Sequence, residues 1–404
     1  MVRKRLLGWP PRRGNSELMP VQPTLWELFT GFLRLGATAF GGPSMVAYIR
    51  EMAVEEKRWV QPEAFDDGVA LCQAIPGATA MQVAAYVGLR ARGVAGAAAS
   101  FTGFGLPAVT LMMALSALYQ RTHNLPAMIS VFGGLQAVIV AVVANAALSF
   151  GESSLRRGPH FVIAALAAVL FGWKVNPMLV IVAASLLGLV ITSAPPSAKS
   201  SVLHPAPLPP NLKAVALIGA VAVLGFVGLW LSQRRLFELA ALMFRIDLFA
   251  FGGGFSSVPF MFHETVEVRR WLDCPTLLDG IVLGQVTPGP IVITATFIGY
   301  LLAGGLGGLV ATIGVFLPSF LVLVSVAPYF DRLRGSPLFR RITSGVLCSF
   351  VGLLLTVTIR FGENVTWDWR HLLVGTAAFA ALRVKVNILW VVLAGAGISL
   401  LVLR

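Results

Sequence analysis

The segment LCQAIPG at Leu71–Gly77 occurs a second time, in altered form, as LGQVTPG at Leu283–Gly289. Both copies place a glutamine three residues before a Pro-Gly pair within an otherwise apolar stretch. Proline lacks the backbone donor and glycine leaves the backbone free, so each pair is expected to interrupt a helix. This repeated interruption is the starting point of the fold prediction.

The duplication extends over almost the whole chain. The motif FGG at 40–42 returns at 251–253, which sets an offset of 211 residues. The Pro-Gly segments are displaced by one residue more, which we assign to an insertion near the pairs Arg58-Trp59 and Arg270-Trp271. Duplication is typical of transporters that build two gates around one site. Duplication of a structural unit without functional symmetry is the alternative.

The repeats give four predicted regions. Residues 1–24 form a basic cytoplasmic segment, 25–193 the first repeat, 194–235 a Pro-rich linker with an extra transmembrane helix, and 236–404 the second repeat. The basic segment is too polar to be a cleaved signal peptide.

Composition indicates a membrane protein, because hydrophobic residues make up 57% of the chain, charged residues 12%, and mean hydropathy is +0.81. We predict an all-α polytopic protein with about 13 transmembrane segments, six in each repeat and one between them. The expected spans are 25–48, 67–89, 94–119, 126–149, 160–174, 176–193, 214–232, 236–260, 279–301, 304–328, 337–360, 371–382 and 386–403. Two of them, 160–174 and 371–382, are short, so each is expected to pair with its follower as a hairpin or to lie partly at the interface.

An even number of spans per repeat and one extra helix turn the second repeat upside down. Positive charges support this inversion, because roughly twice as many lysines and arginines fall in cytoplasmic as in outer loops when the N-terminus is placed inside. We therefore predict an inverted repeat in the inner membrane, with a cytoplasmic N-terminus and a periplasmic C-terminus.

Several functional classes have little support. The net charge of +13 is spread over short loops, which favours contact with anionic lipid over nucleic acid. The three cysteines and five histidines show no metal-ligand spacing, so no metal site and no cofactor are expected. Nucleophile elbows, phosphate loops and catalytic carboxylate pairs are also missing, so we expect no enzymatic activity.

Four interruptions, two per repeat, are predicted to converge near the midplane of the bilayer. Irregular backbone at that depth is tolerated only against protein or a wet cavity, and freed amides at a helix N-terminus favour anions. The alternative is packing glycines and proline kinks without a ligand. The expected backbone ligands of an anion are Gly41, Gly42, Pro76, Gly77, Gly252, Gly253, Pro288 and Gly289.

Side chains near the breaks extend this candidate site. Arg34 and its counterpart Arg245 lie deep in predicted spans, where a charge costs at least ~2.5 kcal/mol unless it faces a cavity or a partner. Two guanidinium groups suit a tetrahedral oxyanion, so replacing either arginine by alanine is expected to abolish transport. A structural ion pair is the alternative. Gln73 and Gln285 are expected either to donate to the anion or to bond a freed carbonyl.

Further charged residues are candidates for gating or for coupling to an ion. They lie within the spans or in the loop after the first span of each repeat, where a tryptophan beside charges is also typical of an interfacial anchor. The set is Glu27, Glu238, Asp247, Arg58, Arg270, Asp67 and Asp279.

These motifs resemble those of the chromate transporter family in its long, two-repeat form. The resemblance rests on FGGP and LCQAIPG in the first repeat, on FGGG, RRW and LGQVTPGP in the second, and covers residues 25–404. The repeats differ at Ile75 and Thr287 and at Ala78 and Pro290, so they need not contribute equally.

The resemblance implies efflux of chromate, with sulfate as a competing analogue, and resistance to chromate. Export of a dianion from a negative interior gains ~2.3 kcal/mol per charge and 100 mV, so alternating access assisted by the membrane potential is expected. Import or exchange of sulfate or another oxyanion, an anion channel, and a membrane-embedded enzyme or scaffold are the alternatives. The expected partners are chromate-like and sulfate-like oxyanions and the lipid bilayer, and a homodimer is compatible with the sequence.

Overall fold

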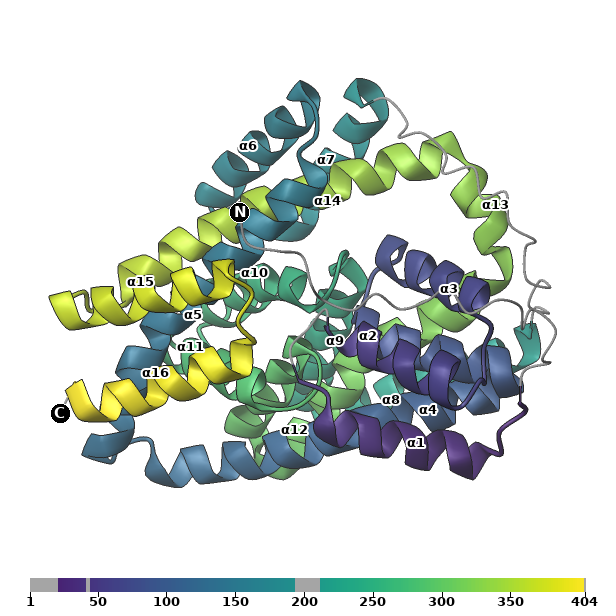
Figure 1. The fold of residues 1–404 in the computed structure, drawn as a ribbon, viewed down its shortest axis with the longest axis horizontal. Helices are drawn as coiled ribbons and strands as arrows, with labels where there is room; N and C mark the ends of the chain where they lie inside the picture. The colour runs from purple at the N-terminus through teal and green to yellow at the C-terminus, as the bar shows by residue number, and fades with distance from the viewer. Residues whose placement is uncertain (1–20, 41–43, 193–210, 403–404) are drawn as a thin grey trace, which may run out of the picture.

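The computed structural model describes residues 21–40, 44–192 and 211–402, and these residues are almost entirely helical (Figure 1). Within them the only β-type pairing is an isolated antiparallel bridge between Pro76 and Phe251. The first repeat contains α1 (Leu25–Thr38), α2 (Ser44–Arg50), the π-helix η1 (Glu51–Glu56), α3 (Pro62–Ala74), α4 (Thr79–Thr122), α5 (Pro126–Ser154), α6 (Gly158–Gly172) and α7 (Pro177–Ile191).

The connecting helix α8 (Leu212–Ser232) leads into the second repeat, which follows the same order with a few additional short turns. It contains α9 (Arg234–Phe249), η2 (Gly254–Ser256), α10 (Ser257–Phe262), the π-helix η3 (His263–Val268), α11 (Cys274–Val286), η4 (Ile291–Ile293), α12 (Thr294–Val326), η5 (Ala327–Tyr329), α13 (Phe330–Gly335), α14 (Pro337–Asn364), α15 (Trp369–Arg383) and α16 (Ile388–Val402).

Five helical segments among the described residues are long and apolar enough to cross a membrane: Thr79–Thr122, Pro126–Ser154, Leu212–Ser232, Ile291–Tyr329 and Pro337–Asn364. Shorter apolar helices accompany them. Helix α8 has no buried residue although it is strongly apolar, as expected of a helix that faces lipid. The all-α polytopic membrane fold predicted from the sequence is therefore confirmed.

The predicted helix interruptions that fall on described residues are present. The predicted span 236–260 divides into α9 and the segment η2–α10, with Ala250–Gly253 between them. Likewise α3 ends at Ala74 and α4 begins at Thr79, so Pro76-Gly77 lies between two half-helices. Gly41 and Gly42 lie outside the described residues.

The long helices α4 and α12 each fold back on themselves. Gly93 in α4 has φ +64° and ψ −155°, and Gly304 in α12 has φ +61° and ψ −153°. A Cβ added to Gly88 would lie 2.1 Å from the Gly96 carbonyl oxygen, although residues eight apart in a straight helix are about 12 Å apart. Each helix is therefore a tight hairpin, which agrees with the separate spans predicted at 67–89 and 94–119.

The repeats exchange their last two helices. The pair α6–α7 packs on α14 of the second repeat, while α15–α16 packs on α5 of the first, and α4 packs on α12 (Figure 1). Glycines allow the close approach, since Cβ atoms at Gly345 and Gly352 would lie 2.3 and 2.2 Å from the carbonyl oxygens of Ala184 and Ala164. Such reciprocal contacts are those of a pseudo-twofold arrangement.

The short helix pairs α6–α7 and α15–α16 are helical hairpins. Each helix has 15 residues, about 22 Å, which is shorter than a bilayer core of about 30 Å. Lys174 and Lys385 turn the chain with φ of 64° and 65°. Asp368 begins α15 by accepting hydrogen bonds from the amides of His371 and Arg370, and these bonds lower the pKa of its carboxyl group.

The position of the one-residue insertion differs from the prediction. The π-helices Glu51–Glu56 and His263–Val268 are equivalent and already show the larger offset, so the extra residue precedes them. It belongs to the glycine break, which has four residues between Phe251 and Ser256 where the first repeat has three between Phe40 and Ser44. The Arg-Trp pairs are conformationally equivalent, with φ of 54° at Arg58 and 53° at Arg270. A longer break shifts the following helix without changing its fold.

Candidate functional site

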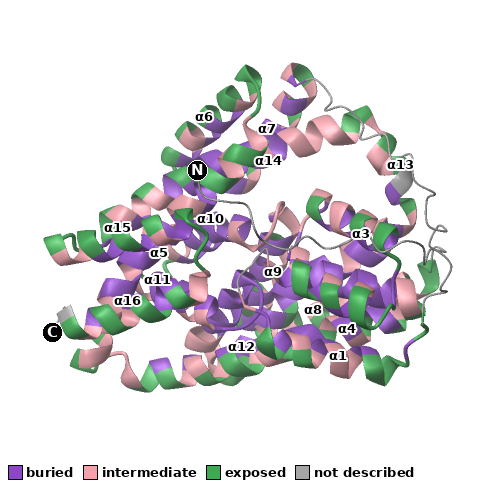
Figure 2. Ribbon diagram, in the orientation of Figure 1, coloured by how far each residue is buried: buried purple, intermediate pink, exposed green. Residues whose placement is uncertain are grey.

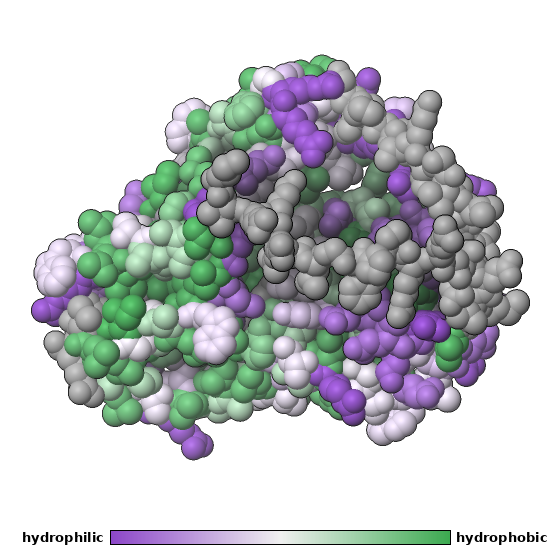
Figure 3. Space-filling view, viewed as in Figure 1, coloured by the Kyte–Doolittle hydropathy of each residue, from purple (hydrophilic) through white to green (hydrophobic). Residues whose placement is uncertain are grey.

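The helix interruptions meet at a central cavity of about 480 Å³. Its lining comes from α2 and α3 of the first repeat, from the start of α4, and from the segments before α10 and α12 of the second repeat. The face of the molecule in Figure 3 is mainly apolar over α15 and α16. Described interruptions of both repeats therefore contribute to the lining of one cavity.

Several helical segments begin at this cavity. The lining includes Thr79 and Ala80 at the start of α4, Gly254 and Phe255 at the start of η2, and Ile291 at the start of η4. The first amides of a helix have no partner within the helix, and the helix dipole places partial positive charge there. The cavity therefore borders the N-terminus of α4 and the short turns η2 and η4, which favours a negatively charged ligand.

The backbone breaks support one another across the repeats. The Gly77 amide donates to the Ala250 carbonyl over 2.7 Å, next to the bridge between Pro76 and Phe251. Gly77 and Gly289 have φ of +123° and +120°, and Gly252 and Gly253 have φ of +81° and +113°. Residues other than glycine rarely adopt these backbone conformations, which explains the glycines at the breaks.

The two glutamines line the cavity in different ways. Gln73 is exposed at the end of α3, whereas Gln285 at the end of α11 is 9% exposed. The side-chain nitrogen of Gln285 is buried and has no hydrogen-bond partner. A buried donor without a partner is costly, so this amide is a ready donor to an oxyanion.

Arg50 is the one Lys or Arg side chain among the described residues that line the cavity. Its guanidinium pairs with Asp66 and lies 5.8 Å from the centre of the Phe65 ring. Its side chain is 38% exposed, so it can exchange partners. Arg50 has no counterpart in the second repeat, because the π-helix alignment places the apolar Phe262 at the equivalent position, so repetition in the sequence does not single it out.

Arg34 and Arg245 do not line the cavity, which corrects the prediction that they face it. On α1, Leu28, Phe32 and Gly36 form the buried stripe, and Arg34 lies two residues from Phe32 and so points away. Arg245 is also exposed and lies at an apolar groove between α8, α9 and α12. Depth in a span was a poor guide here because it does not specify the helix face.

The other candidate gating residues fall into distinct surroundings. Asp67 pairs with Arg334 over 2.8 Å, whereas its counterpart Asp279 accepts hydrogen bonds from Tyr119 over 2.8 Å and Gln136 over 2.9 Å. These contacts hold α3 and α11 to different parts of the molecule. Asp67 and Asp279 are therefore matched in sequence and different in role.

Among the remaining candidates, the carboxylate of Glu27 accepts from the Thr24 amide over 2.7 Å and completes the N-terminal cap of α1. Glu238 is exposed on α9, while Asp247 is fully buried. Arg58 and Arg270 share the left-handed backbone described above. Of these, only Asp247 lies in the protein interior.

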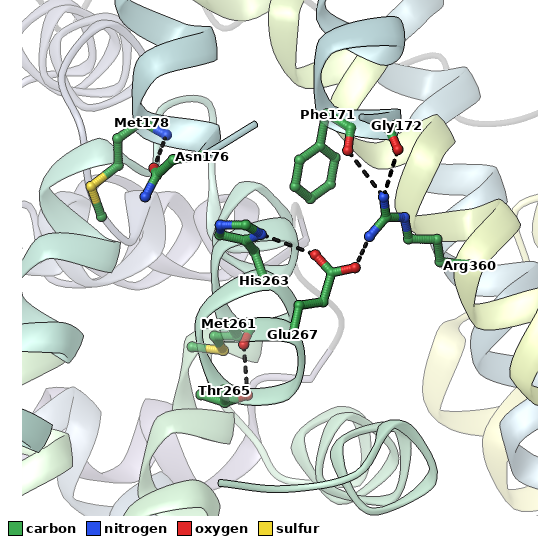
Figure 4. A network of polar contacts seen from close by, with 9 residues as sticks. All are labelled: Phe171, Gly172, Asn176, Met178, Met261, His263, Thr265, Glu267 and Arg360. Atoms are coloured by element: carbon green, nitrogen blue, oxygen red, sulfur yellow. Dashed lines mark hydrogen bonds and ion pairs between the residues drawn. The ribbon is translucent and has the colours of Figure 1, made fainter. Parts of the chain in front are cut away.

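A cluster of polar side chains connects η3 of the second repeat to its neighbours (Figure 4). Glu267 pairs with Arg360 and with His263, whose Nδ1 lies 2.9 Å from its carboxylate. Arg360 also donates to the carbonyls of Phe171 and Gly172 at the end of α6, over 3.1 and 3.0 Å. This cluster, here called the Arg360 cluster (His263, Glu267 and Arg360), joins η3, α14 and α6.

The first repeat has no equivalent cluster. The π-helix alignment places Glu51 at the position of His263, and the 211-residue offset places Ser149 at that of Arg360. Glu51 and Glu55 are exposed on η1. Matching of the repeats could not reveal the cluster, because only its glutamate recurs.

Burial confirms that the two sides of the cavity differ (Figure 2). Every residue of α10 is buried, and α11 is buried along most of its length. The equivalent helices α2 and α3 have several exposed residues, including Ala47, Tyr48, Asp66 and Gln73. The cavity is thus lined by accessible helices on the first-repeat side and covered on the second-repeat side.

Metal binding has no support in the described part of the chain, where no group of three or more His, Cys, Asp or Glu residues could hold an ion. The cysteines Cys72, Cys274 and Cys348 are buried and unpaired. The lining instead supplies amide, hydroxyl and guanidinium donors, which suit an oxyanion.

Comparison with known proteins gives the family. The sequence profile of the family described as chromate transporter matches residues 26–189 and 237–400. An uncharacterized transporter of Methanocaldococcus jannaschii is 42% identical over 382 residues, covering 94% of this chain and 95% of its own. A chromate transport protein of Pseudomonas aeruginosa is 31% identical over 405 residues, covering 94% of this chain and 93% of its own.

A probable chromate transport protein of Synechococcus elongatus is 31% identical over 378 residues, covering 91% of this chain and 92% of its own. No solved structure matches the chain. Profile matches over both repeats and relatives above 30% identity along nearly the full length agree with the resemblance found in the sequence. The chain belongs to the chromate transporter family.

Proposed function

We propose that this protein exports chromate across the inner membrane by alternating access, with the membrane potential assisting, and so confers resistance to chromate. The observation that carries the proposal is the central cavity, where helix N-termini, the unpartnered amide of Gln285 and the guanidinium of Arg50 surround one space. Chromate is a tetrahedral dianion and needs many donors at short range, which this lining supplies.

The ligand assignment follows the geometry rather than depth in the span. Arg50, Gln73, Gln285 and the backbone around Gly77 and Gly289 hold the anion in this proposal. Arg34 and Arg245 are left out because they face away from the cavity. In the proposed orientation the N-terminus is cytoplasmic and the C-terminus periplasmic.

The unequal burial of the repeats supports alternating access. Equivalent half-helices are accessible on one side of the cavity and covered on the other. A pseudo-symmetric transporter can reverse its access by exchanging the conformations of its two repeats. The Arg360 cluster joins η3, on the covered side, to α14 and α6.

The membrane potential provides a driving force for export. Each charge that leaves across 100 mV contributes ~2.3 kcal/mol, and chromate carries two. No nucleotide is needed for this direction.

The test is chromate accumulation in everted inner-membrane vesicles that carry the protein, with and without energisation and with excess sulfate. We expect saturable uptake that requires the potential and is inhibited by sulfate. Vesicles with Arg50→Gln serve as the binding-deficient comparison and vesicles with Arg34→Ala as the matched control. Absence of uptake at normal protein levels would contradict chromate export.

Import of sulfate or a similar oxyanion is the second candidate, and one observation favours it. Uptake of a dianion against the potential requires a coupled cation, and Asp247 is a fully buried carboxylate close to the cavity. Uptake by right-side-out vesicles that depends on a proton gradient would favour this candidate over export.

A further inference from the structure

Asp247 is a buried carboxylate without a cationic partner. Its side chain has no exposed surface, and none of the ion pairs among the described residues includes it. One carboxylate oxygen, Oδ2, accepts from the Ser319 amide over 2.9 Å and from the Ser319 hydroxyl over 2.6 Å. The other, Oδ1, is buried and has no hydrogen-bond partner. A negative charge held in this way is strongly disfavoured.

The elements around Asp247 supply almost no compensating charge. Helix α10 has no charged residue, α12 has none between Thr294 and Val326, and α8 has only Lys213 in its first turn. The arginines of α4 lie near its fold-back, at Arg90 and Arg92, and at its far end, at Arg121. On α9 itself, Arg234, Arg235 and Glu238 are at least two turns away, and Arg245 is exposed on another face.

Asp247 is connected to the backbone of the candidate anion site. The Ser319 hydroxyl that donates to Asp247 accepts from the amide of Ala78, over 2.8 Å. Ala78 directly precedes Thr79, which lines the cavity. Three residues after Asp247, the Ala250 carbonyl accepts from Gly77. The carboxylate thus supports the Pro76–Thr79 segment from behind the cavity.

A second oxygen in this region also lacks a donor. Gln82 donates through its amide nitrogen to the Pro76 carbonyl over 2.7 Å and to the Ser319 carbonyl over 3.3 Å. Its Oε1 atom is buried without a partner. The environment therefore has unsatisfied acceptors, and a bound proton would turn one of them into a donor.

The site occurs in one repeat only. The 211-residue offset places Gly36 at the position of Asp247 and Ala108 at that of Ser319. A Cβ at Gly36 would lie 2.3 Å from the Phe104 carbonyl oxygen, so no side chain fits there. A carboxylate in one repeat, where the other has a packing glycine, points to a role beyond the shared fold.

We infer that Asp247 is a proton-binding site whose protonation is linked to oxyanion occupancy of the central cavity. We take the cation to be a proton, because a proton needs one acceptor and Oδ1 of Asp247 is a buried acceptor without a partner. Protonation removes a negative charge behind the Pro76–Thr79 segment, so a dianion binds more tightly. By linkage, the dianion raises the affinity of Asp247 for its proton to the same extent.

The inference rests on the proposed function only in taking the cavity as an oxyanion site. The test is therefore a binding measurement, which does not depend on the direction of transport. Sulfate is the probe, because it stays a dianion from mildly acidic to mildly alkaline pH. Its affinity for the purified full-length protein is measured by calorimetry across this range, together with proton uptake on binding in weakly buffered solution.

We expect the affinity of the wild-type protein to fall on the order of fivefold or more toward alkaline pH, with proton uptake on binding. Asp247→Asn keeps the shape of the side chain and removes its charge, so its affinity should stay high and independent of pH. Asp279→Asn is the matched control. It replaces another buried carboxylate, one that is bonded by Tyr119 and Gln136, and should keep the wild-type pH dependence.

Three results would overturn the inference or its basis. Sulfate binding without pH dependence or proton uptake in the wild type overturns the linkage alone, and an ordered water would then satisfy Oδ1. An unchanged pH dependence in Asp247→Asn overturns the assignment to this residue. Absence of sulfate binding at every pH overturns the oxyanion site as well. If Asp247→Asn does not fold, Ser319→Ala is used, and it should weaken the pH dependence.

Discussion

At the scale of single residues, the cavity presents one donor that has no partner within the protein. The side-chain nitrogen of Gln285 is buried and free, whereas its counterpart Gln73 is exposed and can bond to water. A hydrogen bond to a charged group contributes about 1.5–3 kcal/mol. Gln285→Ala should therefore weaken oxyanion binding roughly tenfold to hundredfold, and Gln73→Ala much less. Calorimetric titration of both variants with sulfate checks this, and equal losses would contradict a special role for Gln285.

The pairing of Arg50 with Asp66 leads to a second prediction, in which substitutions of the two residues change the affinity for sulfate in opposite directions. Arg50→Gln removes the one guanidinium at the cavity and should weaken sulfate binding. Asp66→Asn releases Arg50 from its partner and removes a negative charge, so it should strengthen binding. Titration at low and high ionic strength measures both effects, which should shrink as salt increases. A loss of affinity in Asp66→Asn would show that the pair acts as a structural unit.

The sequence predicts the positions of the helix breaks more reliably than it predicts the direction in which a helical side chain points. The Pro-Gly pairs and Gln285 reach the cavity because helix breaks and their flanks are fixed by local chemistry. Arg34 and Arg245 do not, because the face of a helix depends on which neighbours it packs against. Arg50 is not marked by the sequence repeat, because the equivalent position of the second repeat is Phe262.

At the scale of elements, the folded-back helix α4 contains glycines with two different roles. Gly93 allows the turn of the backbone, and Gly88 allows the two arms of the hairpin to pack closely. Gly93 has a conformation that is essentially restricted to glycine, and a Cβ there would meet nothing within 4 Å. Gly93→Ala should therefore cost on the order of 1–3 kcal/mol through backbone strain alone. Gly88→Ala should cost more, because its Cβ would lie 2.1 Å from the Gly96 carbonyl oxygen.

Thermal unfolding of the two variants in detergent measures this difference. Gly158→Ala is the control, because the added Cβ would meet nothing within 4 Å and the glycine has no positive φ. A Gly93→Ala protein as stable as the control would contradict the strain argument.

Element boundaries were largely predictable, and the pairing of elements was not. Glycine and proline mark the ends of α3 and α11, and the short spans at 160–174 and 371–382 each form a helical hairpin with the helix that follows. The exchange of α6–α7 and α15–α16 between repeats left no signal in one sequence, because any apolar hairpin can pack on any long apolar helix. Tertiary contacts of this kind are set by shape complementarity, which periodicity does not encode.

At the scale of the whole molecule, the two repeats have nearly the same elements but different exposure. The Arg360 cluster fixes η3 to α14 and α6 on the covered side, and the first repeat has no equivalent. Removing one member of a buried charge network is strongly destabilising to the state that contains it. Arg360→Met should therefore shift the population toward the conformation in which the second-repeat side is open.

Cysteine accessibility tests this shift in a protein whose native cysteines, Cys72, Cys274 and Cys348, are replaced by serine. Val69→Cys on α3 and Ile281→Cys on α11 are equivalent positions, the first partly exposed and the second fully buried. A hydrophilic thiol reagent should modify Val69→Cys and spare Ile281→Cys. Adding Arg360→Met should reverse this preference, because opening one side of a pseudo-symmetric carrier closes the other. If Arg360→Met makes both cysteines react more strongly, the Arg360 cluster stabilises the fold as a whole. If the reactivity of neither cysteine changes, the cluster does not control access to the cavity.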